Sequence, residues 1–473
     1  MADTKTTVFP LSPIDMLMPR MHVPKLLYFA STAEPATIIS ILRVALELTI
    51  ESIPIIAGSV ALSTQADEQK GFLNVQSPYF TATDIISTKD LRSEYDYEQL
   101  RAAHFPVSGV PFDVIAPKAF GKAGDSAPVM VAQANLLRGG LLLFFALHHC
   151  VFDEMGIFNV MKVWASYCRR GGELDLITPQ WFDRSPLSQG EGKGRLEDHP
   201  EYTLSPKEAI VRATEDPSTF YPIAADVDSV VFFISDESLD QLKMAAKNPG
   251  PDDRLGIDSI HEITTNDALI ALFWCCITSA RINDSTQAIA EIFPRFGMAM
   301  NGRSQLRPAM STDYCGNAVL IAKTFTRADD LISVEPGRLA RAALLVRKSV
   351  KVVNDVYIKD VIQMVRNVDD VGRLAPRRRP AVDHSLGCST WARQPYYSLD
   401  WGQTLGGSCE RVRWRRLQTD GLFIIFPRLP PHAGDPRNAT QGGVEVQLAL
   451  KRDHLEKLME DPLFTKYVQW RCS

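Results

Sequence analysis

Hydrophobic positions along the chain form runs and repeats that predict both strands and helices. Residues 128–137 and 141–149 are two apolar runs of strand length, and the Arg138-Gly139-Gly140 sequence between them is typical of a tight turn. We expect these runs to form a hairpin whose second strand ends at His149. Apolar residues then recur at helical spacing over residues 154–168, so a helix should follow at once. The pattern therefore places His149 at a strand-to-helix corner.

Similar patterns predict further elements on both sides of this corner. An amphipathic helix should run through residues 38–48, and another should begin after the cap formed by Ser235. A shift to proline, glycine and charge over about residues 171–222 is typical of a surface crossover between domains. The other expected elements are strands at 25–29, 230–234, 421–427 and 443–450, helices after Thr265-Asn266-Asp267, over 334–368 and at 452–460, and a loop at 247–258.

Length and composition fit a chain of more than one domain. The protein has 473 residues, of which 45% are hydrophobic and 23% are charged, so it can bury large cores. Length alone predicts two or three domains. Together with the crossover, this predicts an N-terminal domain over residues 1–185, a linker over 186–226 and a C-terminal domain over 227–473.

Charge, cysteine content and the first residues narrow the class of protein. The formal net charge of -5 argues against nucleic acid as the main partner, because binding phosphates needs a basic face. We see no secretory signal at the N-terminus and no apolar run long enough to span a membrane. The eight cysteines lack C-x-x-C or paired His/Cys spacing, which disfavours a zinc site and a disulfide framework. We therefore expect a cytoplasmic protein.

The histidine at the strand end is the first candidate for chemistry. His149, Asp153 and Gly156 form a His-x-x-x-Asp-x-x-Gly string, and a histidine with a near-neutral pKa suits a general base. Taken alone the spacing is weak evidence, because such a pair can arise by chance in a chain with nine histidines. A histidine that ends an apolar strand can also be a core residue bonded to a backbone carbonyl. The motif therefore needs context from the rest of the chain.

Separate strings along the chain supply that context. They are Leu11-Ser12-Pro13-x-Asp15, Pro54-x-x-Ala57-Gly58, His149-x-x-x-Asp153, Phe182-Asp183-Arg184-Ser185, Thr265-Asn266-Asp267-Ala268-Leu269, Asn301-Gly302-Arg303-Ser304, Gly316-Asn317-Ala318, Ser389-Thr390-Trp391 and Asp400-Trp401-Gly402. By these strings the chain resembles the BAHD acyltransferases, and within them the fungal branch that includes trichothecene acetyltransferases. The strings cover nearly the whole chain in the family's order, which makes the set more specific than any one of its members.

The resemblance implies both a fold and a reaction. The fold would be α/β, with two chloramphenicol acetyltransferase-like domains of mixed sheet and helices and a channel between them. Acyl-CoA would enter from one face and the acceptor from the other, with His149 in the middle, and the enzyme would be a monomer. In the family the aspartate of the histidine motif turns away from the pocket and pairs with an arginine. By position that pair here would be Asp153 and Arg303.

Two strings depart from the family pattern. The family's Asp-Phe-Gly-Trp-Gly is replaced by Asp400-Trp401-Gly402-Gln403-Thr404, so no role of the missing tryptophan can be carried over. We interpret Asp400, Trp401 and Gly402 as a structural loop that shapes the CoA side. Glu154 stands where plant members have glycine, while Gly156 resembles the fungal pattern. Both changes favour the fungal branch over a plant-type enzyme.

One residue is assigned a catalytic role. Transfer to a hydroxyl needs a base that takes the proton as the oxygen attacks the thioester carbonyl, and we assign this role to His149. A covalent acyl-enzyme is not needed, because a thioester is already activated. Cys150 is the nearest candidate nucleophile, but strand alternation would point its side chain to the opposite face. We expect His148 to be a structural or channel-wall residue rather than a second base. The residues expected to fix the geometry of the loop are Asp153, Gly156 and Arg303.

Basic and aromatic residues offer further contacts. The arginines at 377–379 and those in Arg411-Val412-Arg413-Trp414-Arg415-Arg416 could meet the phosphates of CoA, although a charge-rich loop is more often only solvated. We expect the rings of Trp391 and Trp401 in the core rather than as a platform for the acceptor. No metal site and no tightly bound cofactor are expected, since acyl-CoA would act as a co-substrate.

The favoured function is an acyl-CoA-dependent O-acyltransferase, with acetyl-CoA as donor and a hydroxyl of a small secondary metabolite as acceptor. Two alternatives stay open. A stand-alone condensation domain of the peptide-synthetase type shares the histidine motif and can form amides from carrier-bound thioesters, although Glu154 and the Asp400-Trp401-Gly402 loop count against it. A catalytically silent, ligand-binding member of the same fold would keep the motif without turnover.

Overall fold

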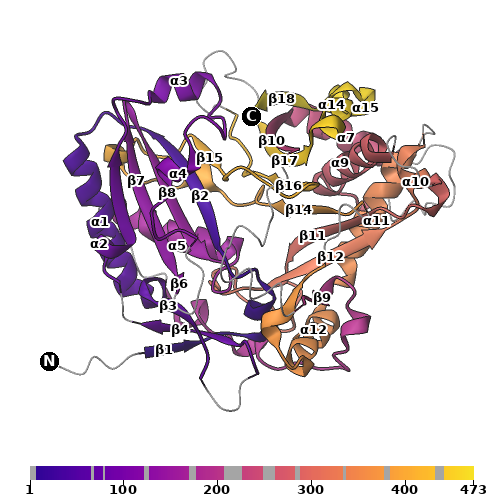
Figure 1. Ribbon diagram of the computed structural model, residues 1–473, viewed down its shortest axis with the longest axis horizontal. Helices are drawn as coiled ribbons and strands as arrows, with labels where there is room; N and C mark the ends of the chain where they lie inside the picture. The colour runs from indigo at the N-terminus through magenta and orange to yellow at the C-terminus, as the bar shows by residue number, and fades with distance from the viewer. Residues whose placement is uncertain are drawn as a thin grey trace.

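Two large β-sheets organise the computed structural model, and helices pack on their faces (Figure 1). The structure describes residues 7–64, 69–77, 80–121, 127–169, 177–206, 226–248, 261–282, 288–333, 337–377, 384–431 and 442–473. Strands and helices alternate along the chain, and both sheets contain parallel and antiparallel pairs. The predicted mixed α/β class is therefore confirmed.

The five-stranded sheet is built mainly from the N-terminal part of the chain. Its strand order is β15 (Arg411–Arg413), β2 (His22–Ala30), β8 (Gly140–His148), β7 (Met130–Leu137) and β5 (Ile86–Asp90). The predicted hairpin is present as β7 and β8, which pair antiparallel and turn at Gly139, where φ is 80°. Glycine suits this turn because it has no Cβ to clash at positive φ.

Helices cover both faces of this sheet. α1 (Pro35–Ser52) and α5 (Glu154–Cys168) pack on one face, and the shorter α3 (Tyr97–Ala102) and α4 (Phe112–Ile115) pack on the other. Odd-numbered apolar residues of β8 face α5, and even-numbered ones face the opposite side. Because β8 is buried on both faces, its sequence is a continuous apolar run rather than an alternating one.

A smaller sheet extends from the same part of the chain. Its strand order is β1 (Thr7–Pro10), β4 (Leu73–Ser77), β3 (Ser59–Leu62) and β6 (Ala127–Pro128), and α2 (Ala82–Ile85) follows β4 in sequence. All three pairings in this sheet are antiparallel.

The seven-stranded sheet belongs to the C-terminal part. Its strand order is β12 (Val319–Phe325), β11 (Arg295–Asn301), β14 (Leu386–Thr390), β16 (Leu422–Ile425), β17 (Gly443–Lys451), β10 (Val227–Ser235) and β18 (Gln469–Cys472). α9 (Thr265–Ile282) lies at the centre of the helices on this sheet and is buried on nearly every side. The helices around it are α7 (Asp236–Ala246), α10 (Ala328–Ile332), α11 (Arg338–Val352), α14 (Arg452–Glu460) and α15 (Pro462–Tyr467).

One predicted element is wrong in length. The sequence pattern predicts a single helix over residues 334–368, but the structure has α11 and then α12 (Asp355–Asn367), with a break at Val353. The side chain of Asn354 accepts a hydrogen bond from the N–H of Tyr357 at 3.1 Å and caps α12. Asparagine favours helix starts over helix interiors because its side chain competes for backbone hydrogen bonds.

Two pairings join parts of the chain that the sequence assigns to different regions. β15, from the predicted C-terminal domain, pairs with β2 at the edge of the N-terminal sheet. β9 (Tyr202–Leu204), in the predicted linker, pairs with β13 (Leu374–Pro376). The boundaries at 185 and 227 stay a prediction, and residues 207–225 of the linker and 249–258 of the expected loop lie outside the described residues. Within the described part of the chain, no helix is long and apolar enough to cross a membrane.

Candidate active site

His149 lies one residue beyond the end of β8, at the corner that the sequence predicts. Its backbone N–H donates to the carbonyl of Met21 at 2.8 Å, which ties the corner to the start of β2. Its ring Nδ1 lies 3.3 Å from the carbonyl oxygen of Phe152. Since a carbonyl only accepts, Nδ1 carries the ring proton and Nε2 keeps its lone pair. Nε2 has no hydrogen-bond partner among the described residues, so it is free to accept a proton.

The surroundings of His149 favour its neutral form. Burial of the ring lowers the pKa of His149 below its ordinary value, and the ammonium of Lys25 lowers it further. The charge of Asp153 and the carbonyl of Phe152 raise this pKa but do not reverse the shift. A base must be unprotonated before it can act. At neutral pH the ring is therefore in the state that general-base chemistry needs.

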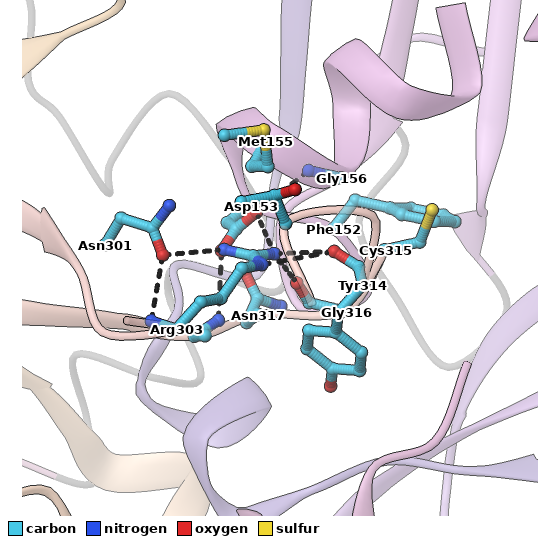
Figure 2. Close-up of polar contacts among 12 residues, drawn as sticks. Phe152, Asp153, Met155, Gly156, Asn301, Arg303, Tyr314, Cys315, Gly316 and Asn317 are labelled. Atoms are coloured by element: carbon cyan, nitrogen blue, oxygen red, sulfur yellow. Dashed lines mark hydrogen bonds and ion pairs between the residues drawn. The ribbon is translucent and has the colours of Figure 1, made fainter. Parts of the chain in front are cut away.

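The carboxylate of Asp153 is directed at Arg303 (Figure 2). Oδ2 accepts from Nη1 of Arg303 at 2.7 Å, and Oδ1 accepts from Nη2 at 2.8 Å. Oδ1 also accepts from the backbone N–H of Gly156 at 2.9 Å and so caps α5, and Oδ2 accepts from the N–H of Ala318 at 2.9 Å. The expected ion pair is present, and both oxygens of the carboxylate are occupied by structural contacts.

Arg303 is held as firmly as its partner. Its guanidinium donates to the carbonyl oxygen of Tyr314 at 2.9 Å, to that of Gly316 at 2.7 Å and to Oδ1 of Asn301 at 3.1 Å (Figure 2). The side chain is only 1% exposed. A buried guanidinium needs this many acceptors because an unpaired charge in the interior is strongly unfavourable. Arg303 thus joins the start of α5 to the end of β11 and to the loop before β12.

Gly156 allows α5 to approach that same loop closely. A Cβ at this position would lie 2.0 Å from the carbonyl oxygen of Cys315, far inside van der Waals contact. The obstacle is backbone rather than a flexible side chain, so it cannot move aside without shifting the loop. The glycine of the motif is therefore explained by packing between α5 and the 314–316 segment.

Asp15 and Asn317 also hold the corner in place. Their residue types and local sequence predict no role for them. Nδ2 of Asn317 donates to Oδ1 of Asp15 at 2.7 Å and to the carbonyl oxygen of His149 at 2.9 Å. Arg184 donates to Oδ2 of Asp15 at 3.1 Å and to the carbonyl of Val151 at 3.2 Å. These residues belong to strings that carry the family resemblance, and that membership was the only signal in the sequence.

Lys25 and Glu154 form a buried ion pair near this corner that the sequence does not predict. Nζ of Lys25 lies 2.5 Å from Oε2 of Glu154 and 3.2 Å from the centre of the Trp391 ring. The hydroxyl of Tyr396 donates to Oε1 of Glu154. The sequence marked Glu154 only as a departure from plant members, and Lys25 only as part of a strand. Trp391 is 2% exposed, as expected of a core residue.

The loop Asp400-Trp401-Gly402 lies at the C-terminal end of α5, away from His149. Trp401 is fully buried, with its ring 5.5 Å from that of Phe29 and 5.6 Å from that of Trp164 between centres. Asp400 Oδ1 accepts from the N–H of Gly402 at 2.8 Å, which closes the turn. The expectation that Trp401 lies in the core is confirmed, while the position of this loop on the CoA side stays a prediction.

The two residues beside His149 in sequence have structural surroundings. Sγ of Cys150 contacts the carbonyl oxygen of Met18 at 3.4 Å, and burial raises the pKa of this thiol to about 12. A thiol that stays protonated is not a nucleophile. Nδ1 of His148 accepts from the N–H of Cys150 at 3.3 Å, its ring packs against His22, and burial lowers its pKa well below the ordinary value. His148 is thus a neutral, packed residue, as expected.

The arginine-rich segment is largely internal. Arg413 is fully buried and donates to Oε2 of Glu445 at 2.6 Å, and Arg411 lies 3.8 Å from the same oxygen. Arg416 donates to the carbonyl of Val227 at 2.8 Å. The side chains of Arg411 and Arg413 are thus engaged within the protein rather than presented for phosphates, whereas that of Arg416 is 56% exposed. At the other basic site, residues 378 and 379 lie outside the described residues.

No group of three or more metal-ligating side chains that could hold an ion occurs among the described residues. The corner itself presents one imidazole, that of His149, on a scaffold held by the Asp153–Arg303 pair and by Asn317.

Comparison with known proteins places the chain beside acyltransferases. The family model described as Transferase family matches residues 98–465, and that described as Trichothecene 3-O-acetyltransferase-like N-terminal domain matches residues 25–168. The chain is 26% identical to acyltransferase BOA11 of Botryotinia fuckeliana (strain B05.10), over 98% of each chain. It is 24% identical to O-acetyltransferase ptmV of Penicillium ochrochloron, over 97% of this chain and 96% of that protein.

The fold is similar to that of a solved structure, F. graminearum TRI101 complexed with coenzyme A and deoxynivalenol. The TM-score is 0.78 at 20% identity, and the match covers 98% of this chain and 99% of the other. This likeness confirms the predicted fold class of two α/β parts with mixed sheets.

Proposed function

The chain belongs to the Transferase family and is a fungal BAHD acyltransferase of the trichothecene 3-O-acetyltransferase-like branch, and on this basis we propose the reaction that its residues carry out. It is an acyl-CoA-dependent acyltransferase that acts on a hydroxyl of a secondary metabolite. We propose acetyl-CoA as the donor. Several similar proteins are named O-acetyltransferases, which supports acetyl over longer acyl groups.

His149 is the proposed general base. Nε2 takes the proton of the acceptor hydroxyl while the hydroxyl oxygen attacks the thioester carbonyl carbon. The new C–O bond forms, the C–S bond breaks, and the departing thiolate receives a proton from the imidazolium. No acyl-enzyme is formed, and Cys150 has no part in the step. The observation that carries this proposal is the bond from Nδ1 of His149 to the carbonyl of Phe152, which leaves Nε2 unprotonated.

The other site residues are proposed to position the base. Asp153, Gly156 and Arg303 fix the start of α5 and hence the loop that carries His149. Asp400, Trp401 and Gly402 are proposed as a structural loop that shapes the CoA side. The channel between the two parts of the molecule, with donor and acceptor entering from opposite faces, belongs to the same proposal.

The proposed partners are one small hydroxylated acceptor and acyl-CoA as co-substrate, bound by a monomer in the cytoplasm. All eight cysteines are free thiols and buried, which is the state that a reducing compartment maintains. Neither a tightly bound cofactor nor a metal ion takes part in the proposed step, because the thioester already supplies the activated acyl group.

A transfer assay tests the proposal. The purified protein is incubated with acetyl-CoA and a panel of hydroxylated terpenoids, alkaloids and polyketides, and free CoA and acetylated product are measured. We expect His149→Ala to lower kcat ~10²–10⁴-fold while unfolding at the same denaturant concentration as the wild type. The matched control is His261→Ala, an exposed histidine at the start of the described segment 261–282, which should retain full activity.

Three other outcomes of these assays would contradict the proposed function. Full activity in His149→Ala would remove the proposed mechanism. Transfer only from carrier-bound thioesters, and to amines, would support the condensation-type alternative. Tight binding of a ligand without turnover of any thioester would support a silent member of the fold.

A further inference from the structure

The loop after α3 contains two consecutive residues with a left-handed backbone. His104 has a φ of 61° and Phe105 has a φ of 53°. A single left-handed residue is common just after a helix, although glycine usually stands there. A second one on a bulky aromatic residue is an outlier, because the side chain crowds the backbone at positive φ. Such a conformation persists only where the surrounding contacts impose it, so those contacts indicate what the loop does.

Arg413 supplies the polar contacts that hold this loop. Its Nε donates to the carbonyl oxygen of Phe105 at 2.9 Å, and its Nη2 donates to that of His104 at 2.7 Å. The ring of Phe105 is buried against those of Tyr28 and Tyr97, at 4.6 and 5.4 Å between centres. The backbone and the side chain of the left-handed phenylalanine are therefore both fixed.

The same guanidinium also contacts the other large sheet. Arg413 lies in β15, at the edge of the five-stranded sheet, and its Nη1 donates to Oε2 of Glu445 at 2.6 Å. Glu445 belongs to β17 of the seven-stranded sheet and is fully buried. Arg411 and Arg471 face this carboxylate as well, with their Nε atoms 3.8 and 3.3 Å from its oxygens. Since three guanidinium groups share one counter-ion, replacing Arg413 does not leave Glu445 as an unpaired buried charge.

The loop also contacts the outer strand of the seven-stranded sheet, β18. Sγ of Cys472, the last residue of β18, lies 3.7 Å from the carbonyl oxygen of His104. Oγ of Ser108 donates to the carbonyl oxygen of Ser473 at 2.6 Å. One loop of the N-terminal part thus holds β18 directly and holds β17 through Arg413.

We propose that the loop 103–109 is a strained latch between the two large sheets: the hydrogen bonds of Arg413 keep it closed, and when they break the loop and β18 are released together. The left-handed backbone of Phe105 favours release, because a free loop returns to an ordinary conformation. The buried, charge-assisted hydrogen bonds of Arg413 favour closure. The latch therefore has a closed and an open arrangement, and it determines how tightly the two sheets are joined at this edge.

Hydrogen–deuterium exchange followed by mass spectrometry tests the latch in the full chain. Arg413→Lys keeps the positive charge but lacks the planar fork that donates to two carbonyl oxygens at once. We expect amide exchange to become ~10-fold faster in residues 103–109 and 469–473, and to stay unchanged in β8 and α9. The matched control is Arg416→Lys, because that side chain is 56% exposed. Its exchange should equal that of the wild type in both segments.

A second variant weakens the latch without touching the arginine. Ser108→Ala removes only the hydroxyl that bonds the carbonyl of Ser473, and it should speed exchange in 103–109 and 469–473 by a smaller factor. Faster exchange in only one of these segments, or equal acceleration throughout the protein, overturns the proposal. Should Arg413→Lys fail to fold, Ser108→Ala must still accelerate both segments, because the latch releases as one unit. The measurement needs no substrate, so its result stands whether or not the protein acetylates any acceptor.

Discussion

Arg303 and Asp153 meet through two parallel hydrogen bonds of 2.7 and 2.8 Å, although 150 residues separate them in the chain. Each side chain is 1% exposed. Asp153 caps α5 four residues after His149, and Arg303 follows β11 of the other sheet. The loop that carries the proposed base is therefore fixed by a residue from the C-terminal part, so its geometry depends on how the two parts pack.

Removing the carboxylate charge should therefore destabilise the whole protein. In Asp153→Asn the guanidinium of Arg303 stays buried without its counter-ion, and breaking a buried pair in this way costs on the order of 3–5 kcal/mol. Urea unfolding followed by circular dichroism measures the loss. The matched control is Asp90→Asn, which breaks the exposed pair with Arg92 and should leave the unfolding midpoint unchanged. Equal midpoints for wild type and Asp153→Asn would contradict this account.

A single methyl group at Gly156 should disturb the same loop from the other side. The Cβ of Gly156→Ala would lie 2.0 Å from the carbonyl oxygen of Cys315, so α5 and the 314–316 segment must separate. We expect a loss of about 1–3 kcal/mol in the free energy of unfolding and reduced transfer activity. Gly297→Ala in β11 is the control, because its Cβ would meet only Ile321 at an ordinary 3.5 Å. Similar losses in both variants would exclude the specific clash as the cause.

The sequence predicts local features of this site well and distant contacts only through family resemblance. The hairpin, the corner and the position of His149 follow from hydrophobic runs, because strand and helix periods are written in neighbouring residues. Asp15 and Asn317 are 302 residues apart, and no local pattern indicates that they meet. The contacts of Lys25 cannot be predicted locally either, because its partners Glu154 and Trp391 come from α5 and from the segment after β14.

The error at residues 334–368 has a different physical origin. Helical periodicity continues on both sides of Asn354, so the apolar pattern alone favours one helix. The break is set by the Asn354 side chain, which bonds the N–H of Tyr357 and starts α12 afresh. A capping residue changes the backbone path without changing the hydrophobic pattern, which is why a periodicity argument misses it.

Asn317 should affect the rate of catalysis, because its side chain holds the backbone of His149 in place. Asn317→Ala removes the donor to the carbonyl oxygen of His149 and leaves that oxygen and Asp15 short of a partner. A misplaced base lowers the rate steeply, so we expect kcat to fall ~10–100-fold, with a smaller change in the KM for acetyl-CoA. Steady-state kinetics measure this split. Asn367→Ala, an exposed asparagine at the end of α12, should leave both constants unchanged. Unaltered kcat in Asn317→Ala would show that the carbonyl contact does not hold the base.

The pH dependence of stability should reveal a second histidine, His199, in the predicted linker. Its Nε2 lies 2.8 Å from Oδ2 of Asp360 on α12, and its Nδ1 lies 3.4 Å from Oε1 of Glu201. Burial lowers the pKa of His199, but its ion pair with Glu201 and its hydrogen bond to Asp360 outweigh burial and raise this pKa above the ordinary 6.5. A folded-state pKa above the unfolded value means that the imidazolium stabilises the fold below pH 6.5. This contribution is lost as the pH rises through the higher folded value.

The ionisation of Glu201, a partner of His199, sets the low-pH end of the range in which this interaction stabilises the fold. Burial opposes ionisation of Glu201, but its bonds to His199, Lys323 and Tyr357 lower the pKa of Glu201 to about 2. A depressed pKa means that this carboxylate stabilises the fold above its ordinary pKa and loses that effect only as the pH falls toward about 2.

We therefore expect the difference in free energy of unfolding between wild type and His199→Gln to be largest near about pH 5.5. It should shrink by about pH 8.5. Urea unfolding at both values measures the gap, and His261→Gln at an exposed site should show none. A gap that stays constant across this range would mean that His199 contributes packing rather than charge.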